Sequence, residues 1–238
     1  MLLEVRDLNT YNGKSHVLQD MSISVDQGEI VALLGRNGMG KSTTLKSIMG
    51  LVQPASGSIV YNGKDIFGCA PYQAARAGIG FVPEERRIFP NLPVLDNLKM
   101  GIKHGRVFRG KGRDRWDLEK VYRHFPILKE RGSQKGATLS GGEQQMLSVA
   151  RTLMGNPDLL MIDEPTEGLS PVLTWEVRDV LDTIGKTGVS ILLVEHNLKV
   201  AMSLANRVYL MDKARVGFSG TVEELDANPE IRAKYLEV

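Results

Sequence analysis

The sequence predicts an α/β fold in which a mostly parallel sheet is covered by helices. Short apolar runs, "LLMI", "SILLV" and "RVYLM", have the composition of strands buried on both faces. Between such runs lie segments with helical spacing of apolar residues, for example Leu173, Val177, Val180, Leu181 and Ile184. Strands that alternate with helices are typical of parallel sheets. With 238 residues, 42% of them apolar, the chain is long enough to bury such a core.

Composition and charge narrow the class of protein. The net charge is only +2, so nucleic acid is not an expected partner. No apolar run approaches the roughly 20 residues of a membrane span, and charged residues from position 4 onward interrupt any signal peptide. The one cysteine, Cys69, can form no internal disulfide, which suits a reducing compartment. We therefore expect a protein located in the cytoplasm.

The first sixty residues predict a lobe of antiparallel strands. Three stretches are rich in strand-forming residues: "LLEVRDL", "SISVDQGEIVALLG" and "GSIVYNGKDI". Asn62-Gly63, within the last of them, is typical of a two-residue hairpin turn. The chain is therefore expected to begin with a β-rich part.

A glycine-rich loop, "GRNGMGKS", follows the apolar run "IVALL" and precedes a helix that Gly50 ends. In that context the pattern G-x-x-x-x-G-K-S predicts a P-loop, whose backbone N–H groups and helix dipole bind the phosphates of ATP or GTP. We expect Lys41 to reach the β and γ phosphates and Ser42 to offer its hydroxyl to Mg²⁺. The expected phosphate-binding residues are Gly35, Asn37, Gly38, Gly40, Lys41, Ser42 and Thr43.

Two carboxylates end the apolar run of "DLLMIDEP". We expect Asp163 to hold Mg²⁺ through water and Glu164 to polarise an attacking water. An acidic strand end by itself can equally be a turn, because many strands stop at Asp for that reason. Its combination with a P-loop predicts a nucleoside triphosphatase.

Between "FVP" at 81–83 and "LSGG" at 139–142 the sequence changes to helical patterns. "VLDNLKMGIKH" and "DLEKVYRHF" predict helices, and no strand is expected. We expect one domain over 1–238, in which about 84–154 form a helical insert and 1–83 with 155–238 form the rest. Eleven lysines and arginines but only four acidic residues lie within 101–135, which indicates either a solvated basic surface or contact with anionic lipid.

A second pair of glycines occurs in "LSGGEQQ". Ser140 and Glu143 form a capping box and an apolar face continues through Leu153, so this stretch could be only a helix start. Yet a simple helix cap does not require glycine at positions 141 and 142. The absence of side chains at Gly141 and Gly142 leaves backbone N–H groups open to an anion. Because the P-loop already encloses one side of the phosphates, these donors suit a nucleotide held by another molecule.

The stretches "GRNGMGKST", "LSGGEQQ" and "LLMIDEP", in this order and spacing, resemble the nucleotide-binding subunits of ABC transporters over essentially the whole chain. The resemblance implies a P-loop NTPase fold with a RecA-like core, an antiparallel β lobe and a helical insert specific to ABC proteins. It implies ATP and Mg²⁺ as cofactors, and hydrolysis of ATP to ADP and phosphate coupled to transport. In that family two subunits pair head to tail, so Ser140, Gly141 and Gly142 would close on the ATP of the partner.

The resemblance also implies partners and a location. A second ATPase subunit, identical or different, would complete the dimer. Two membrane permease subunits would bind it, and a periplasmic substrate-binding protein would act indirectly. The chain would lie peripherally on the cytoplasmic face of the inner membrane.

Further positions follow from the resemblance. Tyr11 stands where the family stacks an aromatic ring on adenine, although a tyrosine before a turn also suits ordinary packing. His196 stands where the family's switch histidine contacts the γ phosphate, which makes Glu164 and His196 the expected catalytic residues. Glu84 stands where the superfamily has a glutamine, and a carboxylate lacks the donor of that amide. Ser170 stands where the superfamily has an aspartate. The expected metal ligands are Ser42, Glu84 and Asp163.

"GFVPEERRIFPNLPVLDNL" and "TLSGGEQQMLSVARTLMGNP" are similar to the second, shorter ATPase subunit of bacterial branched-chain amino acid importers, a group that also serves urea and short amides. We expect an importer of branched-chain or other hydrophobic amino acids, with a urea or short-amide importer as the alternative. An ATPase of a lipopolysaccharide exporter is disfavoured by Glu84 and "ERRIF". The sequence lacks the long coiled-coil insertion or second cassette that is expected of a soluble ABC protein acting on DNA or ribosomes. A P-loop kinase is disfavoured because its catalysis does not need the "LSGG" motif.

The stretch "PEERRIFPNL" has a proline near each end, which argues against a helix. We expect an exposed loop in which Ile88 and Phe89 contact a helix of the membrane subunit while Arg86 and Arg87 set its register. A plain surface loop is the alternative.

Overall fold

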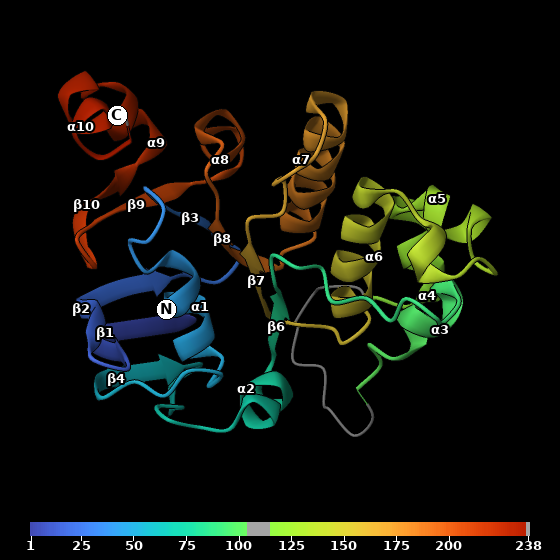
Figure 1. The fold of residues 1–238 in the computed structure, drawn as a ribbon, viewed down its shortest axis with the longest axis horizontal. Helices are drawn as coiled ribbons and strands as arrows, with labels where there is room; N and C mark the ends of the chain where they lie inside the picture. The colour runs from blue at the N-terminus through green and yellow to red at the C-terminus, as the bar shows by residue number, and fades with distance from the viewer. Residues whose placement is uncertain (104–114, 237–238) are drawn as a thin grey trace.

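The computed structural model describes residues 1–103 and 115–236, which contain two sheets (Figure 1). The four-stranded sheet is antiparallel, in the order β2-β1-β4-β5. Its strands are β1 (Leu3–Asn12), β2 (Ser15–Val25), β4 (Ser56–Tyr61) and β5 (Lys64–Asp65). Asn62 and Gly63 join the last two strands with φ values of 49° and 71°, so the predicted hairpin turn is confirmed.

The second sheet has six strands in the order β10-β9-β3-β8-β7-β6. Five strands are parallel, and β10 is an antiparallel edge strand. The bounds are β3 (Ile30–Gly35), β6 (Ile79–Val82), β7 (Leu159–Asp163), β8 (Ser190–Val194), β9 (Arg207–Asp212) and β10 (Arg215–Thr221). The predicted α/β fold with an antiparallel lobe is therefore confirmed.

The stretch "SISVDQGEIVALLG" forms parts of two strands. A turn that includes Gly28, with φ of 76°, divides it into the end of β2 and the start of β3. The two parts lie in different sheets, because only β3 pairs with the parallel strands β8 and β9. The turn thus takes the chain from the lobe into the parallel sheet, where β3 leads to the glycine-rich loop.

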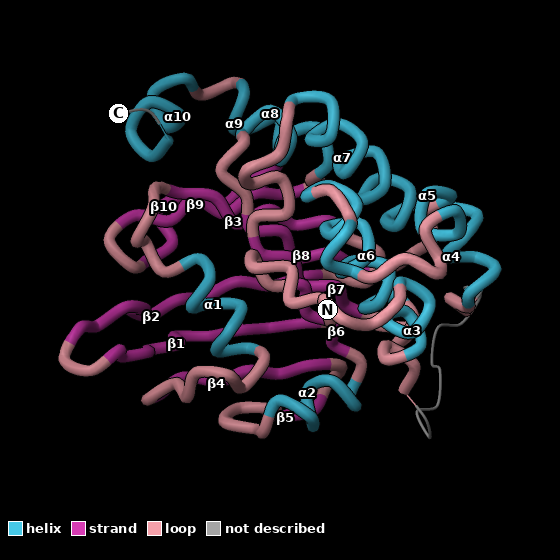
Figure 2. The backbone as a smooth tube through the Cα atoms, turned by 45° about the vertical axis from the view of Figure 1, so that its right-hand side comes forward, coloured by secondary structure: helices cyan, strands magenta, loops and turns pink. Residues whose placement is uncertain are grey.

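The antiparallel lobe and α1 cover one face of the parallel sheet, and α6 and α7 cover the other (Figure 2). Alternate residues of β7 face opposite ways: Leu159 and Met161 pack with the lobe and α1, while Leu160 and Ile162 pack with α6 and α7. The bounds of the helices around this sheet are α1 (Lys41–Ile48), α2 (Pro71–Ala77), α6 (Gly141–Leu153), α7 (Pro171–Lys186), α8 (Leu198–Leu204), α9 (Val222–Asp226) and α10 (Pro229–Leu236).

The expected helical insert lies at one end of the molecule (Figure 1). Its elements are α3 (Val94–Lys99), α4 (Leu118–His124), α5 (Pro126–Glu130) and the 3₁₀ turn η1 (Gly136–Thr138), packed with α6. In the parts of 84–154 that the structure describes, an isolated bridge between Pro93 and Lys135 is the nearest feature to a strand. The "RGKGR" part of the basic segment lies outside the described residues.

No helix in the described part of the chain has both the length and the apolar character needed to cross a membrane.

The loop between β6 and α3 is not helical, as the prolines predicted. The buried side chain of Asn97 holds it: Oδ1 accepts from the N–H of Phe89 at 2.8 Å, and Nδ2 donates to the carbonyl of Phe89 at 2.9 Å. Phe89 is exposed at 43%, whereas Ile88 packs against the helical core. The expectation that both side chains are displayed is thus wrong for Ile88, because its aliphatic side chain gains burial there.

Replacing Asn97 with alanine should lower the free energy of unfolding by about 3 kcal/mol, because the N–H of Phe89 loses its acceptor inside the protein. Chemical denaturation measures this change. The control is Lys99→Ala on the same helix, whose side chain is exposed and should alter the unfolding free energy by less than about 0.5 kcal/mol. Equal unfolding curves for the two variants would contradict the assigned role of Asn97.

Candidate nucleotide site

The glycine-rich loop connects β3, which ends at Gly35, to α1, which begins at Lys41. Gly40 caps α1 with φ of 97°, in the left-handed region that favours glycine. A Cβ atom on Gly40 would lie 2.7 Å from both Leu18 Cδ2 and the carbonyl oxygen of Val17. The close approach of the lobe therefore requires glycine here, and the loop meets the helix with the geometry of a phosphate-binding loop.

Lys41 is 4% exposed, and its ammonium group folds back over the loop. Nζ donates to the carbonyl oxygens of Gly35 at 3.0 Å and Arg36 at 3.1 Å, and lies 3.9 Å from Glu164 Oε1. Burial lowers the pKa of Lys41, against the opposing effect of the nearby carboxylates. The loop thus holds a cation beside the acidic end of β7.

Asp163 and Ser42 meet at the carboxyl edge of the sheet. Ser42 Oγ donates to Asp163 Oδ1 at 2.9 Å, and Asp163 is only 1% exposed. Burial raises the pKa of Asp163, while the hydrogen bond from Ser42 opposes this shift. Asp163 Oδ2 has no hydrogen-bond partner within the described residues. A hydroxyl beside a buried carboxylate with an unused oxygen fits the ligand set of a hydrated Mg²⁺ ion.

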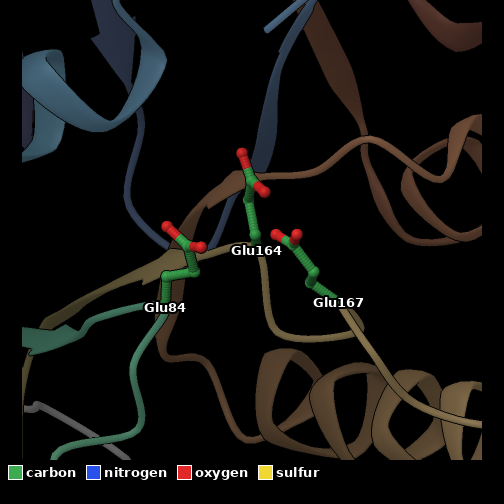
Figure 3. Close-up of side chains that lie close together, drawn as sticks. All are labelled: Glu84, Glu164 and Glu167. Carbon is green, nitrogen blue, oxygen red and sulfur yellow. The ribbon is translucent and has the colours of Figure 1, made fainter.

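Three glutamates converge beside this pair (Figure 3). One carboxylate oxygen each from Glu84, Glu164 and Glu167 lies within 4.8 Å of the others. Glu84 follows β6, and Glu164 follows β7. Sequence reasoning missed Glu167, although the tight turn in which its N–H donates to the carbonyl of Glu164 at 3.2 Å brings it back to the site. Glu84, itself one of the expected metal ligands, therefore lies beside Glu164 and Glu167.

Glu164 and His196 contact one another across adjacent strand ends. His196 Nε2 lies 2.6 Å from Glu164 Oε1. Burial, followed by a hydrogen bond with Glu167, raises the pKa of Glu164 to about 8, and burial together with Lys41 lowers the pKa of His196. The two side chains expected to be catalytic are thus in direct contact at the carboxyl edge of the sheet.

These groups share one cavity of about 350 Å³. It brings together most of the residues expected from the sequence, namely Asn37, Gly38, Gly40, Lys41, Ser42, Thr43, Glu84, Glu164 and His196. Val17 and Glu167 also line it and were not expected. Gly35 ends the strand below the loop, and Asp163 joins through its hydrogen bond to Ser42.

Tyr11 and the "LSGG" residues do not line this cavity. Tyr11 is 49% exposed and stacks on His16, with ring centroids 4.2 Å apart and planes 8° apart. Ser140 caps α6: its Oγ accepts from the N–H of Glu143 at 3.3 Å, and Glu143 Oε2 accepts from the N–H of Ser140 at 2.7 Å. In Figure 1, α6 and α1 lie on opposite sides of β6 and β7. A single chain thus leaves these expected residues apart from the phosphate loop.

The glycines of "LSGG" have different surroundings. Gly142 is buried, and a Cβ atom there would lie 2.9 Å from Leu173 on α7, so its lack of a side chain serves packing within the chain. At Gly141 the nearest group is the guanidinium of Arg86, at 3.1 Å from a Cβ atom. Ser170, at the position of the expected aspartate, caps α7 by accepting from the N–H of Leu173 at 3.4 Å.

A glycine-rich loop at the start of a helix, beside an acidic strand end of a parallel sheet, is the geometry of a P-loop nucleotide site. The family model described as "ABC transporter" matches residues 18–167. The chain belongs to this ABC transporter family.

Relatives and solved structures agree with this family. The chain is 41% identical over 235 residues to the high-affinity branched-chain amino acid transport ATP-binding protein BraG of Pseudomonas aeruginosa, covering 99% of both chains. It is 37% identical over 225 residues to the probable branched-chain amino acid transport ATP-binding protein LivF of Archaeoglobus fulgidus, covering 94% of each. A lipopolysaccharide export system ATP-binding protein, LptB of Haemophilus influenzae, is 32% identical over 220 residues, covering 92% of this chain and 90% of LptB.

A crystal structure of a nucleotide-free ATP-binding cassette from an ABC transporter superposes with a TM-score of 0.84. It is 25% identical, and the match covers 99% of this chain and 97% of that one. The architecture of the present chain is therefore that of an ATP-binding cassette of this family.

Replacing Glu164 with glutamine should leave ATP bound but lower turnover at least about 100-fold, because the amide keeps the shape of the side chain and loses the carboxylate that activates water. Phosphate release measures turnover, and a fluorescent ATP analogue measures binding. The control is Glu85→Gln, an exposed neighbour of Glu84 that does not line the cavity. Turnover at the wild-type rate in the Glu164 variant would remove Glu164 from the catalytic role.

Proposed function

We propose that the chain is the ATP-hydrolysing subunit of an importer of branched-chain or other hydrophobic amino acids. The observation that carries the proposal is the shared cavity in which the phosphate loop meets Glu164 and His196. The substrate class is supported by the relatives named for branched-chain amino acid transport, which are more similar than the lipopolysaccharide export relative. A urea or short-amide importer remains the alternative within the same group.

The residues of the cavity suit this chemistry. Lys41 and the loop N–H groups would hold the phosphates of ATP, and Glu164 would accept a proton from the attacking water while His196 contacts the γ phosphate. Ser42 and Asp163, with Glu84 through water, would hold Mg²⁺, which when bound neutralises phosphate charge. Tyr11 would stack on adenine after leaving its contact with His16.

A second copy or a related ATPase subunit would complete each site. The start of α6 lies outside the cavity of its own chain, yet Ser140 and Gly141 carry the donors that the sequence suggested for phosphate. In a head-to-tail dimer this helix start would close on the partner's ATP. The guanidinium of Arg86 beside Gly141 adds positive charge at the same place.

Membrane permease subunits would bind a groove of about 440 Å³ between the sheet and the helical insert. Apolar side chains and three cations line it, and within the described residues the lining has no carboxylate. The lining includes Leu51, Phe81, Arg87, Phe89, Met100, Lys103 and Arg151. Arg151 Nη1 is buried without an acceptor among the described residues. By charge complementarity we propose that a permease helix with apolar residues and at least one carboxylate occupies the groove.

Arg86 does not line this groove, unlike Arg87. The expectation that both arginines set the register of the membrane helix is therefore revised to Arg87 and Arg151. Arg151 Nη2 donates to the carbonyl of Arg87 at 2.8 Å, and its guanidinium lies 5.2 Å from the centre of the Phe89 ring.

The proposal includes the expected division of the chain: about 84–154 as the helical insert, and 1–83 with 155–238 as the β lobe and RecA-like core. It also includes a peripheral position on the cytoplasmic face of the membrane, since the groove would be filled by a permease. A periplasmic substrate-binding protein would deliver the amino acid to that permease.

With ATP, the Glu164→Gln variant should accumulate as a dimer, because bound ATP joins the subunits without being consumed. Adding Ser140→Arg should abolish the dimer and leave ATP binding to the monomer within about twofold, since the defect lies on the surface that faces the partner. Size-exclusion chromatography measures the dimer. The matched control adds Ser56→Arg, at an exposed serine of β4 in the antiparallel lobe. If ATP binding to the monomer falls together with the dimer, the shared site is not supported.

Replacing Phe89 with aspartate should leave the ATPase activity of the isolated subunit within about twofold of wild type and abolish both copurification with the permease and uptake, because a carboxylate would enter the apolar contact. The control is Leu92→Asp, on the same loop but outside the lining of the groove. Normal uptake by the Phe89 variant would end the docking proposal. Loss of basal hydrolysis as well would show that this loop serves the active site.

A further inference from the structure

Glu195 is a buried carboxylate between β8 and His196, and it is 2% exposed. Its two oxygens each accept two hydrogen bonds. Oε1 accepts from the N–H of Thr166 at 3.2 Å and from its hydroxyl at 2.6 Å. Oε2 accepts from the N–H groups of His196 and Asn197, both at 2.9 Å. The carboxylate therefore joins two separate loops, one through each oxygen.

The two loops carry the groups that meet in the cavity. Thr166 follows Glu164 by two residues in the turn after β7, and His196 follows β8. The pairing of these strands ends at Asp163 with Val194, and the N–H of Glu164 donates to the carbonyl of Val194 at 2.9 Å. Beyond that point Glu195 continues the link between the loops, next to the 2.6 Å contact of Glu164 with His196.

The charge of Glu195 is held by hydrogen-bond donors alone in the described structure, where no lysine, arginine or histidine forms an ion pair with it. A buried carboxylate is costly unless its oxygens are fully hydrogen-bonded. All four donors come from the two loops, so the carboxylate is satisfied only while the loops stay side by side. A glutamine would present an amide to two of these donors and could bind only one loop well.

We propose that Glu195 is a positioning residue that holds the loop of His196 against the loop of Glu164 during ATP hydrolysis. The proposal rests on the ATPase function proposed above and adds to it a residue that does not touch the phosphates. Its effect would pass through the placement of His196 and Glu164. It should therefore alter the rate of the chemical step more than the binding of ATP.

The test compares Glu195→Gln with the pair Thr166→Val and Thr166→Ser in the full chain. Glu195→Gln should lower kcat about 10- to 100-fold and leave the KM for ATP, and the affinity for a fluorescent ATP analogue, within about twofold. Thr166→Val removes one hydrogen bond to Oε1 and should lower kcat in the same direction by a smaller factor. Thr166→Ser keeps the hydroxyl and should restore the wild-type rate.

A double-mutant cycle separates positioning from a general loss of structure. If Glu195 acts through His196, then His196→Ala should lower kcat much less in the Glu195→Gln background than in the wild-type background. Independent, multiplicative effects would overturn the proposal. So would an unchanged kcat in Glu195→Gln, or a fall in kcat matched by an equal loss of ATP affinity.

ATP hydrolysis by the wild-type chain is measured first, so that a failure of the proposed function can be distinguished from a failure of the positioning role. Absence of ATP hydrolysis by wild type contradicts the proposed function itself. Hydrolysis by wild type with no response to the Glu195 and Thr166 variants contradicts only the positioning role. Should Glu195→Gln fail to fold, Thr166→Val against Thr166→Ser still decides the matter, because neither variant removes a buried charge.

Discussion

The site depends on the parallel alignment of β3, β8 and β7, whose carboxyl ends meet at one edge of the sheet. In the register of these strands, Val194 pairs with both Leu33 and Asp163. The residues that follow each strand are thus brought together: the phosphate loop after β3, His196 after β8 and Glu164 after β7. Because these strands are buried on both faces, a slip in register would cost much of the core, so the same packing that stabilises the fold fixes the chemistry.

Local patterns predicted the parts of the site that local geometry decides. The phosphate loop, the capping box at Ser140 and the hairpin at Asn62 each depend on a few adjacent residues. The residues that were missed act across the chain. Glu195 binds a turn 29 residues away, and Glu167 returns to Glu84, which follows a different strand. No spacing in the sequence indicates such contacts, because the sheet order creates them.

Helix α6 connects the two surfaces at which partners are proposed to bind. Its first turn carries Ser140 and Gly141, and near its other end Arg151 and Ser148 bond to the carbonyls of the loop that presents Phe89. A displacement of the helix start by a nucleotide would therefore reach the groove through a rigid element rather than through flexible chain. We propose that the helix start binds the nucleotide of another subunit, since it does not line the cavity of its own chain.

The most direct test of a nucleotide site shared between two subunits is a structure of the chain determined with bound ATP. We predict a dimer in which each triphosphate is contacted by Lys41 of one subunit and, within hydrogen-bond distance, by the start of α6 of the other subunit. A triphosphate contacted by Lys41 and by the α6 start of the same chain would contradict it. So would a dimer in which Ser140 and Gly141 face away from every nucleotide.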